Sequence, residues 1–158
     1  MSRRVLLQTG FGLGHAFLRA WQGWRDDPKR DYRLDFIAVT PTPPDAGQLG
    51  DAHRGTPLAP LAQALAESWP PRTRNLHRLG FDAGRVHLLL AVGETLALLS
   101  QLQAQVDEFL IDELDLSADP QRAPARVCKG LARLAAPGAR LRGAATQPLR
   151  PALASTGF

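Results

Sequence analysis

Three glycines at alternate positions, Gly10, Gly12 and Gly14, are the residues whose type and spacing point most directly to chemistry. They follow the apolar run 5–7 and precede a helical pattern that extends to about Arg25. A turn between a strand and a helix presents free backbone N–H groups to a ligand, and glycine permits the positive φ and the close approach that this requires. The pattern therefore predicts a ligand-binding turn, with an ordinary surface turn as the alternative.

The spacing of the glycines bears on the type of ligand. A dinucleotide-binding turn has the pattern G-x-G-x-x-G, with its third glycine at position 15. His15 occupies that position, and the third glycine is Gly14. No acidic residue stands at the end of the strand pattern 34–39, where a dinucleotide ribose would be held. Both observations disfavour a nucleotide-binding oxidoreductase.

A second candidate is Asp112, which directly follows the apolar run 109–111. A carboxylate at the end of a central strand can orient an amine and accept its proton. The alternative is a solvated carboxylate at a strand end. The four histidines lack metal-ligand spacing, and the single Cys128 excludes an intramolecular disulfide and a cysteine zinc cluster. No metal site is predicted.

Composition places the chain among ordinary globular proteins. It has 158 residues, 44% of them apolar and 22% charged, so we expect a single domain over residues 1–158. The absence of an apolar run long enough for a membrane helix, and of a signal-peptide core, favours a cytoplasmic protein without a membrane partner. The net charge of +4 comes mainly from scattered arginines, which fit either a nucleic-acid partner or a compositional bias.

The alternation of strand and helix patterns predicts an α/β fold with a doubly wound, mainly parallel sheet in the order 3-2-1-4-5. The expected strands are 5–8, 34–39, 86–92, 109–111 and 140–144. A hairpin arm at 76–81 is expected to precede the third strand, and residues 46–57 are expected to be loop or weak helix. The expected helices are 15–25, 58–68, 94–102, 124–134 and 148–155.

Several stretches, taken together and in order, resemble the methyltransferase domain of the bifunctional tRNA 5-methylaminomethyl-2-thiouridine biosynthesis protein. The main matching stretches are 9–14, 35–37, 63–70, 77–86 and 131–138. The resemblance implies a Rossmann-like, S-adenosylmethionine (SAM)-dependent methyltransferase. It further implies methyl transfer to the aminomethyl nitrogen of a wobble uridine in tRNA, and an FAD oxidoreductase as partner. It also implies that the sheet is truncated here before the family's final antiparallel strands.

The resemblance also assigns site residues. It implies Asp112 as the catalytic residue and places the cofactor at Gln8, Gly10, Gly12, Gly14, Thr40, Gly93 and Glu94. Gln8 and Thr40 stand where the family has carboxylates, and Glu94 replaces an aspartate expected near the adenine. The loss of two hydrogen bonds to charged groups costs about 3–6 kcal/mol, or about a hundred- to ten-thousand-fold in affinity. Glutamate at positions 8 and 40 is therefore expected to tighten SAM binding.

Two functional hypotheses from different classes follow. One is an active SAM-dependent tRNA methyltransferase with a weakened cofactor site. The other is a degenerate, non-catalytic methyltransferase-like binding module, which is favoured by Glu113 and Leu114 where the family has glycine and an aromatic residue. Because the fifth strand is expected to form an exposed sheet edge, self-association is a further expectation.

Overall fold

A computed structural model describes residues 2–71, 73, 75–117, 119–143 and 146–153. Its centre is a six-stranded sheet in the order β3-β4-β2-β1-β5-β6. The strands are β1 (Ser2–Thr9), β2 (Tyr32–Thr40), β3 (Asn75–Phe81), β4 (Val86–Val92), β5 (Val106–Ile111) and β6 (Ala135–Arg142). Every neighbouring pair is parallel except β3 and β4, which form an antiparallel hairpin. The expected order 3-2-1-4-5, corresponding to β4-β2-β1-β5-β6, is confirmed.

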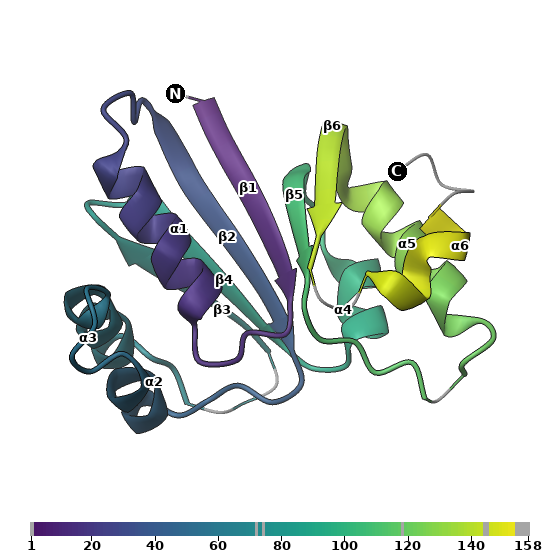
Figure 1. Cartoon of the computed structure of the whole chain (residues 1–158), viewed down its shortest axis with the longest axis horizontal. Helices are drawn as coiled ribbons and strands as arrows, with labels where there is room; N and C mark the ends of the chain where they lie inside the picture. The colour runs from purple at the N-terminus through teal and green to yellow at the C-terminus, as the bar shows by residue number, and fades with distance from the viewer. Residues whose placement is uncertain (1, 72, 74, 118, 144–145, 154–158) are drawn as a thin grey trace.

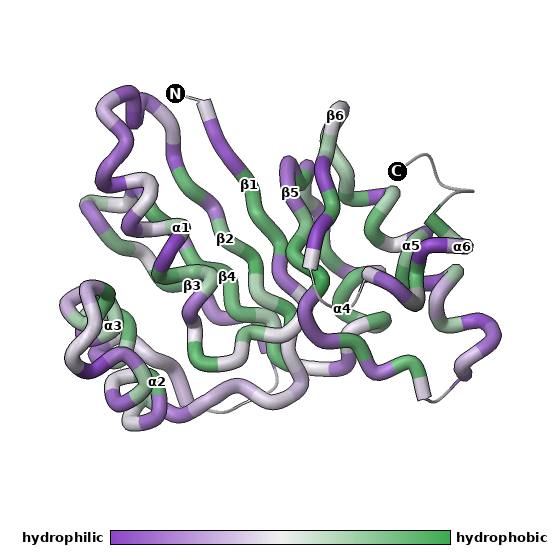
Figure 2. The backbone as a smooth tube through the Cα atoms, in the orientation of Figure 1, coloured by the Kyte–Doolittle hydropathy of each residue, from purple (hydrophilic) through white to green (hydrophobic). Residues whose placement is uncertain are grey.

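Helices cover both faces of this sheet (Figure 1). One side carries α1 (His15–Asp26), α2 (Ala46–Ala52) and α3 (Ala59–Glu67), and the other carries α4 (Thr95–Gln101), α5 (Ala123–Leu134), the 3₁₀ turn η1 (Gln147–Leu149) and α6 (Arg150–Leu153). Two hydrophobic clusters correspond to these sides, one containing Phe17 and Phe36 and the other Phe109 and Leu131. Figure 2 shows the hydrophobic residues concentrated along the central strands.

The β3–β4 hairpin is anchored to α1 through its turn. Asp82, Ala83 and Gly84 all have positive φ, and Asp82 lies against the side chains of two α1 residues. Its carboxylate accepts hydrogen bonds from Trp21 Nε1 at 2.8 Å and from Arg25 Nη2 at 2.7 Å. The hydrogen bond from Arg25, helped by that from Trp21, outweighs burial and holds the pKa of Asp82 below its usual value.

The structure decides one local expectation and corrects another. Of the loop or weak helix expected over residues 46–57, residues 46–52 form the helix α2, because Asp45 and Gln48 make a reciprocal capping box at its start. β6 begins at Ala135 rather than at residue 140, directly after α5, and its pairing with β5 is irregular between Val106 and Glu108. Position 144, the expected end of that strand, and positions 154–155 of the last expected helix lie outside the described residues.

β6 pairs with β5 and, among the described strands, has no partner on its other side. The expected exposed edge is therefore present in the described part of the chain, and self-association through it stays a prediction. No helix in the described ranges is long and apolar enough to cross a membrane.

Candidate functional site

The glycine turn joins the carboxyl end of β1 to the start of α1. Gly10, Gly12 and Gly14 have φ values of 84°, 57° and 79°, so each adopts the left-handed conformation that favours glycine. Gly10 N donates a hydrogen bond to Val39 O at 2.7 Å, which ties the turn to the end of β2. The backbone thus has the conformation expected of a ligand-binding turn.

The N-terminus of α1 is open to a ligand. Gly14 is its N-cap residue, no side chain caps it, and its first turn contains no acidic residue. A Cβ at Gly14 would lie 3.1 Å from the ring of Phe11, a tight contact that adds to the strain of a side chain at φ 79°. Uncapped N–H groups at the positive end of a helix suit an anionic group such as a carboxylate or a phosphate.

Gln8 and Asp112, predicted to bind the cofactor and the acceptor respectively, are in direct contact. Gln8 Nε2 donates a hydrogen bond to Asp112 Oδ2 at 2.9 Å. Gln8 is only 5% exposed, whereas Asp112 is exposed. The amide oxygen, Gln8 Oε1, is buried and has no hydrogen-bond partner among the described residues. The amide therefore fixes the catalytic candidate beside the glycine turn and leaves one acceptor unsatisfied.

Glu113, which stands where the family has glycine, also belongs to this site. Its backbone N–H donates to Thr9 O at 3.0 Å, which places it next to the end of β1. A Cβ added to Gly10 would lie 2.8 Å from both Cβ and Cγ of Glu113. The Glu113 side chain therefore covers the first glycine. In the sequence, its position directly after Asp112 was the observation that could have placed its side chain beside the glycine turn.

Thr40 and Gly93 connect the carboxyl ends of β2 and β4. Thr40 is 1% exposed, and its Oγ1 accepts a hydrogen bond from Thr42 N at 3.2 Å. Gly93 N donates to Thr40 O at 3.0 Å. The two residues lie together at the expected edge, but these groups are engaged in bonds within the chain.

Glu94 is the N-cap residue of α4. Its two carboxylate oxygens accept hydrogen bonds from Leu96 N and Ala97 N, each at 3.0 Å. The bonds satisfy two N–H groups at the start of the helix. As in the case of Thr40, the group predicted to contact the cofactor already has intramolecular partners.

These contacts test whether the residues fit SAM. The glycine turn, the uncapped start of α1 and the unpartnered oxygen of Gln8 fit a ligand with a carboxylate and an ammonium group. The ribose and adenine positions do not offer free carboxylates, because Thr40 has none and Glu94 caps α4. The fit is good at the glycine turn and poor at the two positions beyond it.

Asp112 also lines a cleft of about 600 Å³ between α1 and the strands β1 and β5. His15 and Arg19 border the cleft from the helix, and Glu108 and Arg142 border it from the sheet. Burial alone would raise the pKa of Glu108, but hydrogen bonds from Arg142 and Arg4 outweigh it and hold the pKa below its usual value. The cleft provides polar space beside the carboxylate of Asp112.

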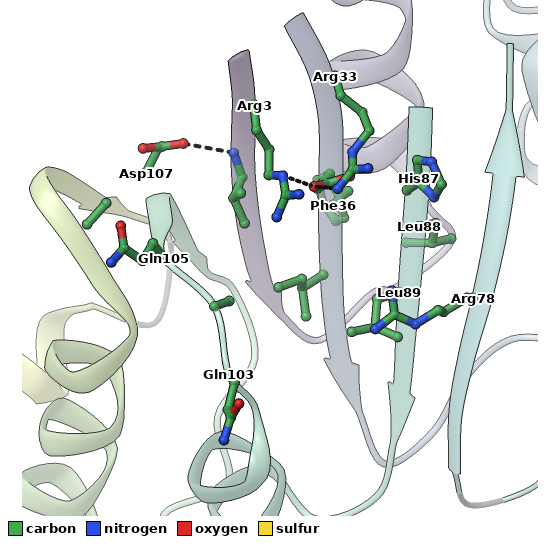
Figure 3. A pocket seen from close by; sticks show the side chains of 15 residues that line it. Arg3, Arg33, Phe36, Arg78, His87, Leu88, Leu89, Gln103, Gln105 and Asp107 are labelled. Carbon is green, nitrogen blue, oxygen red and sulfur yellow. Dashed lines mark hydrogen bonds and ion pairs between the residues drawn. The ribbon is translucent and has the colours of Figure 1, made fainter. Parts of the chain in front are cut away.

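A second cleft, of about 520 Å³, lies on the opposite face of the sheet (Figure 3). It lies beside the amino-terminal halves of β1, β2 and β4, away from the glycine turn. Arg3 and Arg33 both pair with Asp35 there, at 3.2 and 2.9 Å. Its arginines are thus partly neutralised, and it is separate from the candidate site. The described residues include no group of three potential metal ligands.

The strand order and the glycine turn after the first strand define a Rossmann-like domain, a fold in which ligands bind at the carboxyl edge of the sheet. The chain belongs to the S-adenosyl-L-methionine-dependent methyltransferase family, whose sequence model matches residues 56–158. The family assignment and the resemblance recognised in the sequence agree.

Curated relatives extend the match to nearly the whole chain. The tRNA 5-methylaminomethyl-2-thiouridine biosynthesis bifunctional protein MnmC of Methylibium petroleiphilum is 42% identical over 157 residues, which cover 99% of this chain and 24% of the relative. The protein of the same name from Cupriavidus necator is 44% identical over 156 residues, covering 98% and 24%. The chain therefore spans about a quarter of the length of these relatives.

A solved structure supports the fold. The crystal structure of MNMC2 from Aquifex aeolicus superposes with a TM-score of 0.71 at 16% sequence identity, covering 100% of this chain and 48% of that chain. At this identity the similarity concerns the fold alone.

Proposed function

We propose that this chain is a methyltransferase domain that acts on tRNA, transferring a methyl group from SAM to the aminomethyl nitrogen of a wobble uridine, with a weakened cofactor site. The observation that carries the proposal is the contact between Gln8 and Asp112, beside the glycine turn. The relatives are named for 5-methylaminomethyl-2-thiouridine biosynthesis, which supplies the substrate class.

Asp112 has the position that the chemistry requires. An amine attacks through its lone pair, so it must be unprotonated when the methyl group is transferred, and it loses a proton as the new N–C bond forms. A carboxylate within hydrogen-bond reach can align the amine and accept that proton. When bound, SAM supplies an electrophilic methyl group on a sulfonium. Gln8 keeps the Asp112 side chain oriented because it donates to one carboxylate oxygen.

The cofactor residues Gln8, Gly10, Gly12 and Gly14 form the part of the proposed SAM site that fits best. The glycines supply the turn, and Gln8 Oε1 is free to accept a hydrogen bond from the cofactor ammonium. Thr40, Gly93 and Glu94 border the ribose and adenine positions. Because Glu94 and Thr40 bond within the chain, we propose weak SAM binding.

A non-catalytic, methyltransferase-like binding module is the alternative. The observation that favours it is the Glu113 side chain, which lies against Gly10 where a ligand would approach the turn. A displacement of about 1 Å at a reacting centre can cost about a hundred-fold in rate. In this alternative the chain binds tRNA or a protein partner without transferring a methyl group.

The relatives are named bifunctional, and the chain covers about a quarter of their length. We include in the proposal an FAD oxidoreductase as functional partner and, since tRNA is the substrate, the cytoplasm as the place of action. Mixing the chain with such an oxidoreductase and measuring methyl transfer with and without it tests the partnership. An unchanged rate and no co-elution would contradict it.

Calorimetry with SAM and a transfer assay with labelled SAM test the proposal. We expect SAM dissociation constants well above micromolar, and slow label transfer to tRNA that carries 5-aminomethyl-2-thiouridine. Asp112→Asn should abolish transfer while leaving SAM binding within about threefold, because the residue faces the acceptor. Micromolar SAM binding by the wild type would contradict the weakened site. No transfer at millimolar SAM would favour the non-catalytic alternative.

A further inference from the structure

Helix α5 carries a stripe of basic side chains on the face turned away from the sheet. The basic residues occur at spacings of four, three and four, which place them on one side of a helix of 3.6 residues per turn. They are Arg122, at the N-cap position, and Arg126, Lys129 and Arg133 within the helix. All four are exposed, whereas Val127, Cys128 and Leu131 on the other side are buried. Four basic residues within twelve positions of the sequence thus share one face of the helix.

The positive charge of this stripe is not balanced locally. α5 contains no acidic residue. Among the described residues, the side chains of Arg122, Arg126 and Lys129 form no ion pair and no hydrogen bond. Arg133 is different, because its Nη2 donates to Leu99 O and Leu102 O and so supports the end of α4. We therefore define the basic stripe as Arg122, Arg126 and Lys129.

The location of the arginines on α5 is unfavourable for the helix itself. The amino end of a helix is positive, and a cation there costs about 0.3–1 kcal/mol. Arg122 and Arg126 both lie at that end, the first turn contains no acidic residue, and the carboxylate of Asp119 before the helix accepts a hydrogen bond from Arg122 N. An anion bound between them would turn this repulsion into attraction. The arrangement suits anion binding better than it suits folding.

The stripe begins at the sheet edge that carries the candidate active site, on the side of the sheet opposite α1. α5 follows β5 through the segment that starts at Asp112, so its amino end lies at the same sheet edge as the glycine turn (Figure 1). Arg126 and Lys129 also line a groove of about 580 Å³ between α4 and α5. At 1.5 Å per residue the stripe extends about 10 Å from that edge. A polyanion that places one of its monomers at Asp112 could extend from there to the basic residues of α5.

The side chains between the basic residues indicate the kind of partner. Ala125, Gly130 and Ala132 are small, and the stripe contains no aromatic or large aliphatic residue. Membrane-surface helices and protein interfaces use large apolar side chains, whereas phosphate contacts need cations and close approach. We propose that Arg122, Arg126 and Lys129 bind backbone phosphates of the RNA whose nucleotide is presented at Asp112. The choice of RNA rests on the proposed function.

The test compares two triple variants with the same loss of charge. The stripe variant is Arg122→Gln, Arg126→Gln, Lys129→Gln. The control is Lys29→Gln, Arg54→Gln, Arg78→Gln, which removes one lysine and two arginines that are exposed on other elements. Binding of a fluorescent tRNA anticodon stem-loop is measured by polarisation at several salt concentrations, without SAM.

We expect the stripe variant to bind the RNA about a hundred-fold more weakly near 0.1 M salt. The number of phosphate contacts, obtained from the slope of log affinity against log salt concentration, should fall by about two or more. The control variant should lose less than about tenfold in affinity, and the number of phosphate contacts obtained from its slope should change by less than about one. Equal losses in both variants, or an unchanged slope in the stripe variant, would overturn the proposal. So would stripe-dependent binding to phosphatidylserine vesicles without stripe-dependent binding to RNA.

A folding control and an activity control complete the design. Since the substitutions remove cations from the positive end of α5, the melting temperature of the stripe variant should be unchanged or higher. Should it fall, Arg126→Gln alone is used, with about a tenfold weaker affinity expected and an unchanged affinity counting against the proposal. RNA binding that depends on the stripe, without methyl transfer by the wild type, would refute catalysis but support the stripe. Wild-type transfer with an unchanged KM for tRNA in the stripe variant would overturn the stripe alone.

Discussion

Gln8 Nε2 lies 2.9 Å from Asp112 Oδ2, so a buried amide on β1 holds an exposed carboxylate that follows β5. The two residues are 104 positions apart in sequence. A carboxylate at position 8 would place two negative charges at this distance. Glutamine makes this contact without placing a second, buried carboxylate against Asp112 in the ligand-free protein. Glutamate at positions 8 and 40 is still expected to tighten SAM binding, and the cost of the buried carboxylate at position 8 falls on stability.

Gln8→Glu should destabilise the protein by about 3 kcal/mol at pH 7, because the new carboxylate is buried against Asp112 without a cation. Lowering the pH towards 4 should recover most of this loss, since one protonated carboxyl can donate to the other. Gln8→Met is the control, because it removes the donor without adding charge. Urea unfolding at both pH values measures the effect. Equal stability of Gln8→Glu and wild type at pH 7 would contradict the interpretation.

Gly10→Ala should be more destabilising than Gly12→Ala. Both replace a glycine with positive φ, which costs about 1–2 kcal/mol. A Cβ at Gly10 would also lie within 2.8 Å of the Glu113 side chain, whereas at Gly12 no atom lies within 4 Å. The contact with Glu113 should therefore add about 1–3 kcal/mol to the destabilisation by Gly10→Ala and nothing to that by Gly12→Ala.

Glu113→Gly separates the cost of the positive φ at Gly10 from the cost of the contact with the Glu113 side chain. In that background Gly10→Ala should cost no more than Gly12→Ala, because the obstructing side chain is gone. The free energies of unfolding of the four variants form a double-mutant cycle. An additive cycle would show that Glu113 does not cover the glycine turn in solution.

The sheet was predictable because each of its strands has a local pattern. The apolar runs 34–39 and 86–92, together with the Asp82–Gly84 turn signal, were enough to order the strands. For residues 46–57 the sequence left loop and weak helix open, because α2 has only seven residues and little apolar periodicity; the spacing of Asp45 and Gln48 as a capping box could have favoured the helix.

The contacts within the site were less predictable. Proximity of Gln8 to Asp112 followed from adjacent parallel strands, but the hydrogen bond depends on a register that pairs Gln8 with Leu110. The capping role of Glu94 depends on its backbone conformation at the start of α4. The stripe on α5 was present in the spacing, but a count of scattered arginines does not reveal which of them share a helix face.

Asp82→Asn should lower the free energy of unfolding by about 1–3 kcal/mol at pH 7, since it removes the charge that accepts from Arg25 and Trp21. The folded pKa of Asp82 is below its unfolded value of about 3.9. Its contribution is therefore complete above that value and is lost as the pH falls through the folded pKa. The difference between wild type and variant should shrink between about pH 4 and pH 2.

Asp51→Asn is the matched control for Asp82→Asn, because Asp51 pairs with Arg54 at 2.5 Å but both side chains are highly exposed, at 68% and 80%. Exposed pairs contribute little, so we expect less than about 0.5 kcal/mol at any pH. Chemical unfolding at pH 7, 4 and 3 gives both comparisons. A pH-independent difference between wild type and Asp82→Asn would show that the hairpin anchor does not act through its charge.

Thr40→Glu should tighten SAM binding and destabilise the ligand-free protein at the same time. Thr40 is 1% exposed, so a carboxylate there is desolvated until ribose hydroxyls donate to it. One hydrogen bond to a charged acceptor contributes about 1.5–3 kcal/mol, or about a ten- to hundred-fold gain in affinity.

Thr40→Gln has a similar shape without the charge and should gain less than half of that free energy. Calorimetry gives the affinities, and thermal unfolding with and without SAM should show the largest ligand-induced shift for Thr40→Glu. An affinity of Thr40→Glu no better than that of Thr40→Gln would mean that the ribose does not lie at the end of β2.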